Sequence, residues 1–191
     1  MAARSKSSSP PTKPNTKPGF ELNPGQIEAD YLFANPALRH ICAVGGSRSG
    51  KTFFIVRAIM TRALRGDGSR HAILRHRANA ARQSIWLDTL PNVNRICFPD
   101  FPFVEHRQDG FWEGPNGSQI WVGGLDDKDR VEKILGNEYS TIFLNECSQI
   151  SYASALLVRT RLAQSVPGLT QRMYYDLNPV GKMHWTNVLF A

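Results

Sequence analysis

The chain has 191 residues, of which 41% are hydrophobic and 20% are charged, and its formal net charge is +7. This length suits one domain with a sizeable core and is short for two. No apolar run approaches the ~18 residues that a membrane-spanning helix needs, and residues 1–20 lack a signal-like apolar stretch. The sequence therefore argues against a membrane span and against secretion, and we expect no membrane partner.

The three cysteines, Cys42, Cys97 and Cys147, indicate neither a disulfide framework nor a cysteine zinc site. Their number is odd, none forms a CxxC pair, and each lies beside apolar residues. We therefore expect a reducing, intracellular compartment. The positive charge is compatible with a polyanionic partner, and equally with a soluble basic protein that has none.

Two regions differ in composition. Residues 1–19 are mostly Ser, Pro, Lys and Thr, so they cannot bury enough apolar surface to become ordered, and we predict a disordered basic tail. Over residues 20–191, short apolar runs alternate with helical patterns, which is typical of β/α units around a mostly parallel sheet. We therefore predict a single α/β domain over this range.

The expected elements follow in chain order from apolar periodicity and from turn residues. Strands are predicted at 40–44, 71–74, 140–144 and 172–177. Helices are predicted at 52–64, 79–90, 127–135 and 154–163, with Asn79 as an N-cap and Pro91 as a helix stop. Residues 103–122 predict an antiparallel excursion, because two apolar segments flank a Pro-Asn-Gly-Ser turn at 115–118.

A phosphate-binding loop is predicted between the first strand and the helix that follows it. Residues 45–52 fit the pattern G-x-x-x-x-G-K-[ST], whose backbone N–H groups and helix N-terminus bind phosphate. Lys51 would contact the β- and γ-phosphates, and the Thr52 hydroxyl would be a ligand for Mg²⁺. The cofactors expected are ATP and Mg²⁺. The expected nucleotide-binding residues of the loop are Gly45, Gly46, Ser47, Arg48, Ser49, Gly50, Lys51 and Thr52.

Arg48 lies inside this loop, where two interpretations stay open. Its guanidinium would stabilise charge on the γ-phosphate in the transition state, which makes it a candidate catalytic residue beside Lys51. The alternative is a solvated arginine on a loop.

A second strand, at 141–144, ends in the polar residues Asn145 and Glu146. Open α/β sheets place their sites at the carboxyl ends of strands. In the usual triphosphatase pattern, an Asp on the Mg²⁺ side precedes a Glu that activates water. We therefore predict Glu146 as the catalytic base, and Asn145 beside Thr52 on the metal side. The amide of Asn145 can accept from metal-bound water but is uncharged, so we expect weaker Mg²⁺ binding.

Four features in this order resemble the ATPase domain of tailed-bacteriophage terminase large subunits, the motors that pack DNA into a preformed capsid. Gln26 precedes the phosphate loop, as does the adenine-recognising glutamine of that family. The loop itself is similar to the Arg-containing loop of the family, and residues 124–136 resemble the stretch before its acidic strand. Asp176, Leu177, Asn178 and Pro179 look like its coupling motif, which senses the γ-phosphate and transmits hydrolysis to DNA movement.

The resemblance covers roughly residues 20–190 and carries several expectations. It implies a three-layer P-loop NTPase sandwich of the ASCE (additional strand, catalytic glutamate) type. It also implies a motor that grips double-stranded DNA without regard to sequence, assembles as a homo-oligomeric ring, and works with a portal protein and a small terminase subunit. The implied location is the host cell cytoplasm, transiently at the procapsid portal.

Two features depart from the family pattern. Asn145 stands where an acidic residue is usual. The chain also ends soon after the coupling motif, so the carboxyl-terminal RNase H-like nuclease domain is expected to be absent. We therefore expect no DNA cleavage by these 191 residues, and metal-dependent nicking of a plasmid would contradict this.

The carried-over roles each have an alternative. Gln26 is either an adenine contact or a polar turn residue. Asn178 and Pro179 either couple hydrolysis to movement or simply end a strand, because the residue before a proline avoids the helical conformation. An arginine supplied to a neighbouring subunit has three candidates, Arg82, Arg159 and Arg161, each of which is alternatively an ordinary surface arginine.

No helix-turn-helix, zinc finger or basic-aromatic stripe predicts a DNA-binding surface. The densest basic stretch is a candidate for a face that contacts DNA phosphates, with salt-sensitive and sequence-independent binding, or else a solvated strand end. It comprises Arg70, His71, Arg75, His76, Arg77 and Arg82.

Taken together, the motifs predict a Mg²⁺-dependent ATPase domain of a viral DNA-packaging terminase. Two alternatives stay open. One is a nucleotide-binding module that does not hydrolyse ATP by itself, and the other is a different P-loop ATPase, such as a helicase-like motor.

Overall fold

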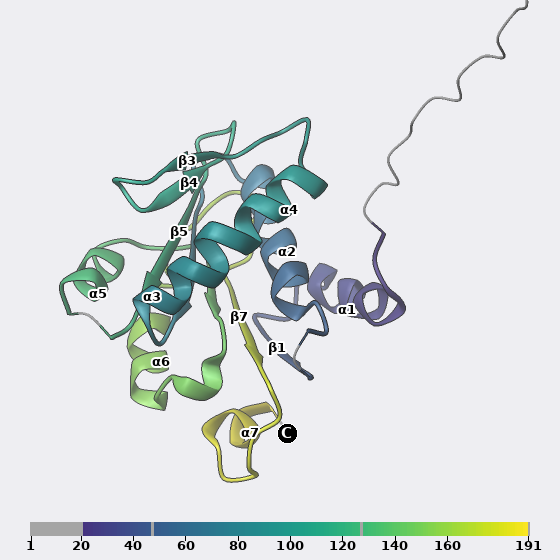
Figure 1. Cartoon of the computed structure of the whole chain (residues 1–191), viewed down its shortest axis with the longest axis vertical. Helices are drawn as coiled ribbons and strands as arrows, with labels where there is room; N and C mark the ends of the chain where they lie inside the picture. The colour runs from purple at the N-terminus through teal and green to yellow at the C-terminus, as the bar shows by residue number, and fades with distance from the viewer. Residues whose placement is uncertain (1–20, 47, 127, 191) are drawn as a thin grey trace, which may run out of the picture.

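The computed structural model describes residues 21–46, 48–126 and 128–190, with only the backbone for residues 128–130. The predicted tail at 1–19, Ser47 of the phosphate loop and Asp127 at the start of a predicted helix lie outside the described residues. The described chain forms one seven-stranded sheet in the order β1-β7-β6-β2-β5-β4-β3, with helices packed around it (Figure 1).

Five neighbouring strands of the sheet are parallel, and β7 lies between the phosphate-loop strand β1 and the acidic strand β6. The predicted parallel sheet is thus confirmed, and the extra strand between β1 and β6 is the arrangement that the ASCE type implies. The parallel strands are β1 His40–Val44, β7 Arg172–Leu177, β6 Thr141–Leu144, β2 Arg70–Arg75 and β5 Gln119–Gly124.

The antiparallel excursion is also confirmed. β4 Phe111–Glu113 pairs antiparallel with β5, and β3 Val104–His106 pairs antiparallel with β4. The predicted turn closes with a hydrogen bond of 2.8 Å from the Gly114 N–H to the Ser118 carbonyl. Gly117 has φ +73°, a left-handed conformation that glycine adopts without steric cost.

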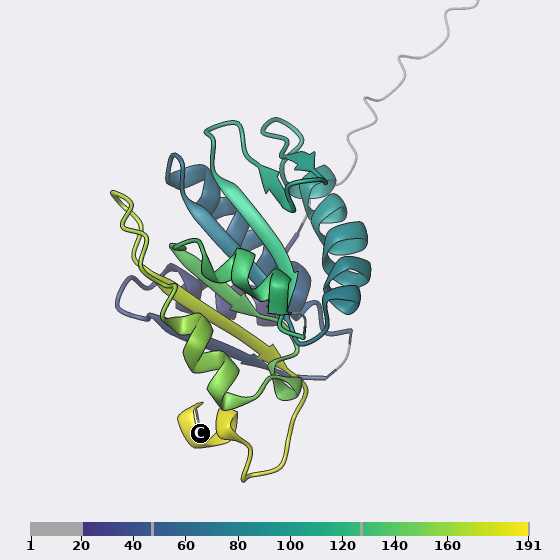
Figure 2. The same ribbon diagram turned by 90° about the vertical axis from the view of Figure 1, so that its left-hand side faces the viewer.

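Helices cover both faces of the sheet. α2 Lys51–Arg65 and the helix formed by α3 Ala78–Ala81, a π-helical segment Arg82–Thr89 and α4 Leu90–Cys97 lie on one face. α5 Lys128–Leu135, α6 Tyr152–Arg159 and α7 Trp185–Phe190 lie on the other, as the opposite positions of α4 and α6 in Figure 2 show. A short 3₁₀ turn, Cys147–Gln149, follows β6.

The core is divided between the two faces because side chains alternate along a strand. On β6 and β7, Phe143 and Tyr174 belong to the cluster under α2, whereas Ile142 and Met173 belong to the cluster under α6. All four side chains are fully buried. Such two-sided burial explains why these strands read as continuous apolar runs in the sequence.

The predicted helix stop at Pro91 is wrong. The helix continues through Pro91 to Cys97, directly after the π-helical segment, in which the Leu90 N–H reaches back five residues to the Ile85 carbonyl. A π-helical turn widens the helix, and such turns occur where the regular i→i−4 hydrogen bonding is interrupted, as it is by proline. The N-cap position is Arg77 rather than Asn79, and the side chain that caps this end is Asp126, whose Oδ1 accepts from the Ala78 N–H at 2.9 Å.

Two helices were missed by the sequence patterns, and α6 Tyr152–Arg159 both starts and ends earlier than the predicted 154–163. α1 Pro24–Ala34 opens with a capping box, in which Asn23 and Gln26 bond each other's backbone N–H groups. α7 is short, and α6 begins at Tyr152 because the Ser151 side chain caps it. In the part of the chain described, every helix is too short or too polar to cross a membrane.

Candidate active site

The phosphate loop lies where the sequence places it, at the carboxyl end of β1 and the start of α2. Its first residue is tied to the neighbouring strand, because the Gly45 N–H donates to the Leu177 carbonyl at the end of β7. Gly50 precedes the helix with φ +78° and ψ 9°, a conformation that strains any residue with a Cβ. Gly45 therefore attaches the loop to the sheet, and Gly50 makes the left-handed turn into α2.

Lys51 folds back into the loop. Its Nζ donates to the Gly45 carbonyl at 2.7 Å and to the Gly46 carbonyl at 2.8 Å, and it lies 3.2 Å from the Ser49 Oγ. The ammonium is thus held at the centre of the loop by backbone oxygens, where a phosphate group would be its natural counter-ion. The predicted phosphate contact of Lys51 is compatible with this position.

Two non-glycine residues in the described chain have left-handed backbones, and both are predicted catalytic residues. Arg48 has φ 64° and Glu146 has φ 50°. Such conformations cost of order 1–3 kcal/mol and are concentrated at functional sites, where the surrounding structure maintains them. At Glu146, the backbone N–H donates to Asp176 Oδ1 at 2.6 Å, which holds this conformation.

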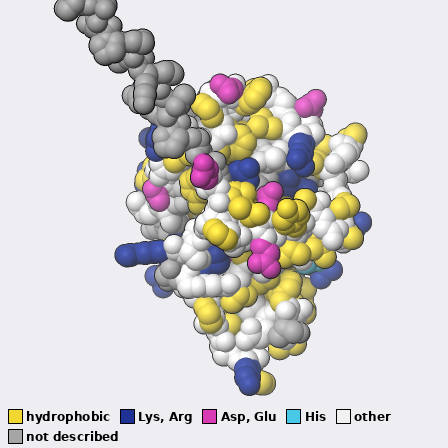
Figure 3. All heavy atoms as spheres, turned by 90° about the vertical axis from the view of Figure 1, so that its right-hand side faces the viewer, with side chains coloured by type: hydrophobic (Ala, Val, Ile, Leu, Met, Phe, Trp, Pro, Cys, Tyr) yellow, Lys and Arg dark blue, Asp and Glu magenta, His cyan; other side chains and the backbone are white. Residues whose placement is uncertain are grey.

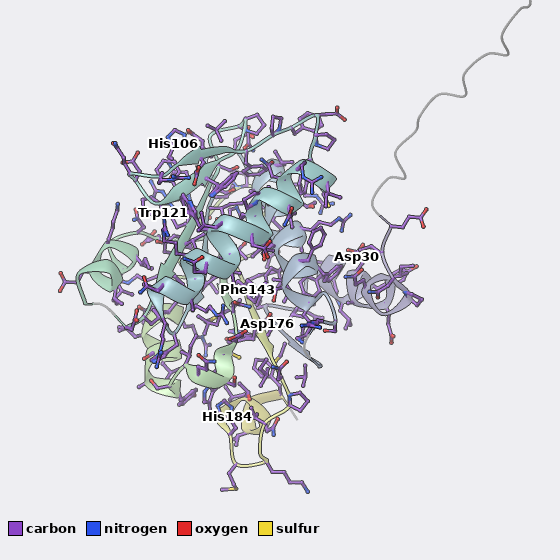
Figure 4. The ribbon with its side chains drawn as sticks, in the orientation of Figure 1. Asp30, His106, Trp121, Phe143, Asp176 and His184 are labelled. Atoms are coloured by element: carbon purple, nitrogen blue, oxygen red, sulfur yellow. The ribbon has the colours of Figure 1, made fainter. Side chains whose placement is uncertain are left out.

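The register of the parallel strands brings the polar residues after β6 and β7 to one edge of the sheet. Leu144 pairs with Tyr175, and Ala43 of β1 pairs with Asp176, so Asn145 and Asp176 follow at the same level. The carboxyl ends of three strands therefore meet below the start of α2. In Figure 4, Asp176 lies near the centre of the molecule, close to Phe143 of β6.

Asp176 is the acceptor at the centre of this cluster. Its Oδ2 accepts from the Thr52 hydroxyl at 2.8 Å, and its two oxygens lie 2.9 and 3.0 Å from Asn145 Nδ2. Only 2% of the residue is exposed. Burial raises the pKa of the carboxyl above its ordinary value, while hydrogen bonds from Glu146, Thr52 and Asn145 and the charge of Lys51 act in the opposite direction.

Asn145 lies beside Thr52, as predicted, but its amide nitrogen faces the cluster. Nδ2 is 3.3 Å from the Thr52 hydroxyl oxygen and contacts both oxygens of Asp176. A carboxylate only accepts hydrogen bonds, so the amide must turn its NH₂ group toward Asp176. The role of Asn145 on the metal side stays a prediction.

Glu146 reaches the other side of the edge, where its carboxylate forms an ion pair with Arg75 at the end of β2. The Arg75 side chain is only 14% exposed, while that of Glu146 is 42% exposed. Arg75 also donates to Ser84 Oγ in the π-helical segment. The candidate base is therefore accessible to solvent and oriented by a fixed cation, a partner that sequence reasoning missed.

Gln26 is not a turn residue, as one interpretation held, but the third residue of α1. Its Oε1 accepts from the Asn23 N–H at 3.1 Å, which completes the capping box of α1. Its Nε2 lies against the phosphate loop, 2.9 Å from the point where a Cβ would stand at Gly50. The residue thus caps a helix next to the loop, and its contact with adenine stays a prediction.

A cleft of about 350 Å³ borders the phosphate loop. Residues 48–53 line one side of the cleft, and the other side comes from the helix that continues through Pro91. There Asn92 Nδ2 donates to Asp88 Oδ1 at 2.9 Å. The predicted helix at 79–90 contained Asp88 and Thr89 but stopped before Asn92, and nothing in the sequence pattern placed this helix against the phosphate loop. The wall residues are Asp88, Thr89 and Asn92.

The remaining predicted site residues are spread around the sheet. Asn178 is exposed and follows β7 at the same edge as Asp176. Arg82 opens the π-helical segment, and Arg159 ends α6. Arg161 lies at the opposite edge of the sheet, where its carbonyl accepts from the Tyr139 N–H just before β6. Which arginine acts on a neighbouring subunit stays a prediction.

The basic stretch considered for DNA contact does not form one surface. His71 is fully buried in β2, and burial lowers the pKa of its imidazole to about 3, so it is neutral near pH 7. Arg75 is engaged with Glu146, and Arg70 stands at the other end of the same strand. The face seen in Figure 3 scatters charges of both signs among apolar side chains.

The sheet order and the loop define this chain as a P-loop protein with the ASCE arrangement of strands. Residues 38–191 match the sequence profile of the phage terminase large subunit family. The chain belongs to this family. Among curated protein sequences, none matches the chain.

Solved structures support the fold. The large terminase of a thermophilic bacteriophage is 16% identical with a TM-score of 0.76, covering 90% of this chain and 42% of its own. The large terminase ATPase domain of Thermus phage P74-26 is 16% identical with a TM-score of 0.58, covering 85% of this chain and 66% of its own. A chain of the bacteriophage Phi-29 packaging motor assembly is 16% identical with a TM-score of 0.56, and the match covers 88% of this chain and 50% of its own. This chain thus spans less than half of the first of these proteins.

Proposed function

We propose that this chain is the ATP-hydrolysing motor domain of a viral terminase large subunit, which drives double-stranded DNA into a procapsid. One observation carries the proposal: Lys51 and Thr52 of the phosphate loop lie at the same sheet edge as Glu146, whose left-handed backbone is hydrogen-bonded to Asp176. Residues from three separate segments of the chain, at 51–52, 146 and 176, thus lie together at this edge. Family membership supports the same function.

Each residue of the edge has a defined task in this proposal. The loop N–H groups and Lys51 hold the phosphates, and Glu146 accepts the proton of the attacking water. Arg75 fixes the position of the Glu146 carboxylate through their ion pair. Arg48 is exposed in the loop wall of the cleft, where its guanidinium would meet charge on the γ-phosphate. Asn178 and Pro179 follow β7 at the same edge and would transmit hydrolysis to movement.

The donor set suits Mg²⁺. Thr52 offers a hydroxyl oxygen and Asp176 a carboxylate, and oxygen donors of these types hold Mg²⁺ together with substrate phosphates and waters. The described residues contain no cluster of three His, Cys, Asp or Glu side chains that would hold a metal without nucleotide. When bound, Mg²⁺ supplies charge neutralisation at the β- and γ-phosphates. ATP-γ-S and ADP occur in structures of the thermophilic phage terminase, which supports nucleotide binding here.

The partners proposed are double-stranded DNA, a portal protein, a small terminase subunit and further copies of this chain in a ring. The likeness to a chain of the Phi-29 motor assembly supports an oligomeric motor. In such a ring, Arg82, Arg159 or Arg161 would complete a neighbouring site. The location proposed is the host cytoplasm and, transiently, the procapsid portal.

A second candidate is a module that binds nucleotide without hydrolysing it alone. Asn145 favours this candidate, because its amide takes the place of a usual acidic residue. A helicase-like motor has less support, since the family profile covers residues 38–191.

The test is Mg²⁺-dependent phosphate release from ATP over a wide range of protein concentration, with Lys51→Ala as the blank and Lys182→Ala as the matched control. Lys182 is exposed on the loop after β7. Turnover that rises faster than protein concentration supports a site completed by a neighbour. Turnover proportional to concentration supports a complete site in each unit. Nucleotide binding without turnover favours the second candidate, and no binding contradicts both.

A further inference from the structure

A buried carboxylate lies beside Thr52 at the sheet edge. In the usual triphosphatase pattern this carboxylate is the first residue after the acidic strand, which here is Asn145. The described structure nevertheless has a carboxylate at this place, and it belongs to Asp176 of the neighbouring strand β7. The carboxylate thus lies beside Thr52, as in the usual pattern, but it comes from β7 instead of from the end of β6.

We infer that Asp176 supplies the metal-side carboxylate that β6 lacks, with Asn145 as its hydrogen-bonding partner. The inference rests on the proposed function, because it assigns a residue to the Mg²⁺–ATP site. It gives Asp176 a direct task at the nucleotide, in addition to its place in the coupling motif.

The contact with Thr52 is the first support. Asp176 Oδ2 is 2.8 Å from the Thr52 hydroxyl, so both oxygens can face one cation that sits between the loop and the sheet. Lys51 is close enough for its charge to act on Asp176. The carboxylate therefore lies on the phosphate side of the edge and not on the Arg75 side, where Glu146 is paired.

The strand register is the second support. Asp176 pairs with Ala43 of β1, and the preceding residue Tyr175 pairs with Leu144 of β6. Asp176 and Asn145 thus lie side by side on adjacent strands, and their side chains meet at 2.9 and 3.0 Å. An acidic residue at either of the two positions would reach the same space below Thr52.

The partners of Asp176 are the third support. Asp176 accepts hydrogen bonds from Asn145, Thr52 and the Glu146 N–H. Burying a carboxylate is nevertheless costly in free energy when no cation lies beside it. These three donors to Asp176 are all uncharged, whereas Glu146 is paired with the cation of Arg75. A divalent cation would compensate this charge.

The inference separates the two acidic groups by task. Asp176 faces the loop and would hold Mg²⁺ directly or through one of its waters, while Glu146 acts on the attacking water. The backbone hydrogen bond from Glu146 to Asp176 connects the two tasks.

The test compares ATP-γ-S binding by calorimetry with Mg²⁺ and with EDTA in place of Mg²⁺, for the wild type and three variants. Asp176→Asn removes the charge at nearly constant size, and the swap Asn145→Asp with Asp176→Asn returns a carboxylate to β6. Asp100→Asn is the matched control, since Asp100 is exposed. Thermal melting of each variant reports on folding.

The expected result is that Asp176→Asn reduces the Mg²⁺-dependent gain in affinity about 10- to 100-fold, a size usual for changes around a bound metal. Binding in EDTA should be unchanged, and the swap should restore most of the gain. A merely structural role would lower both affinities together, and the swap would not restore them.

The outcomes distinguish the inference from the proposed function. If the wild type bound no ATP-γ-S at all, the proposed function would be contradicted. If the wild type showed a Mg²⁺ effect and Asp176→Asn retained it, only the inference would be overturned. If Asp176→Asn did not fold, the swap would decide: a Mg²⁺ effect in the swap supports the inference, and a folded swap without one overturns it.

Discussion

The two edges of the sheet use buried polar groups in opposite ways. At the amino edge, Arg172 donates to the carbonyls of Phe33 and Asn35, and Arg62 donates to Thr141 Oγ1 at 2.9 Å and to the Thr170 carbonyl. Three of these four hydrogen bonds satisfy backbone carbonyls, those of Phe33, Asn35 and Thr170. At the carboxyl edge, Thr52, Asn145 and Asp176 bond one another through side chains.

The bonding partners of a buried polar residue distinguish a structural role from a functional one. Groups that satisfy backbone carbonyls stabilise the fold, because an unpaired buried carbonyl is costly. Groups that bond mainly to other reactive side chains, next to left-handed backbone at Arg48 and Glu146, are poised for a ligand. Burial does not separate the two groups, because Arg172 is 5% exposed, Asn145 3% and Asp176 2%, so the contrast lies in their hydrogen-bonding partners.

The largest expected effect at the carboxyl edge is that of Glu146→Gln. Loss of a positioned general base should lower ATP turnover about 10²- to 10⁴-fold, while ATP-γ-S binding stays close to that of the wild type. Phosphate release and calorimetry measure the two quantities. Glu138→Gln is the matched control, because Glu138 is exposed before β6. Retained turnover in Glu146→Gln would remove the base assignment.

At the amino edge, Arg172→Leu should lower stability. The carbonyls of Phe33 and Asn35 would lose their donors, and α1 would lose its tie to β7, at a cost of about 3 kcal/mol in the free energy of unfolding. Urea denaturation measures this. Arg39→Leu changes an exposed arginine one residue before β1 and should stay within about 0.5 kcal/mol of the wild type. Equal midpoints for both variants would contradict the structural role of Arg172.

The smallest expected effect is the pH dependence caused by His71. Burial lowers the pKa of its imidazole from 6.5 to about 3 in the folded chain, so between these values the unfolded chain binds more protons. The free energy of unfolding should therefore fall on acidification below pH 6.5, by about 1 kcal/mol per pH unit from this group. His71→Gln should make the decline less steep in urea titrations at several pH values. An unchanged slope would show that His71 does not contribute.

Much of this molecule could be predicted because the signals are local. The phosphate loop is eight consecutive residues between a strand and a helix, and β1 and β7 have the predicted bounds. The hairpin follows from one turn of four residues. The same local view failed at Pro91, where the helix continues after a π-helical segment, and it overlooked the capping box at Asn23 and Gln26.

The class of fold, the phosphate loop and the candidate base could be predicted from local patterns, since apolar periodicity and contiguous motifs specify strands, helices and turns without distant contacts. The set of side chains that meet at the sheet edge could not be predicted in this way. Asp176 and Thr52 are 124 residues apart, and Arg75 lies far from Glu146 in the chain. Their contacts depend on strand order and register, which arise from packing the whole sheet between its two layers of helices.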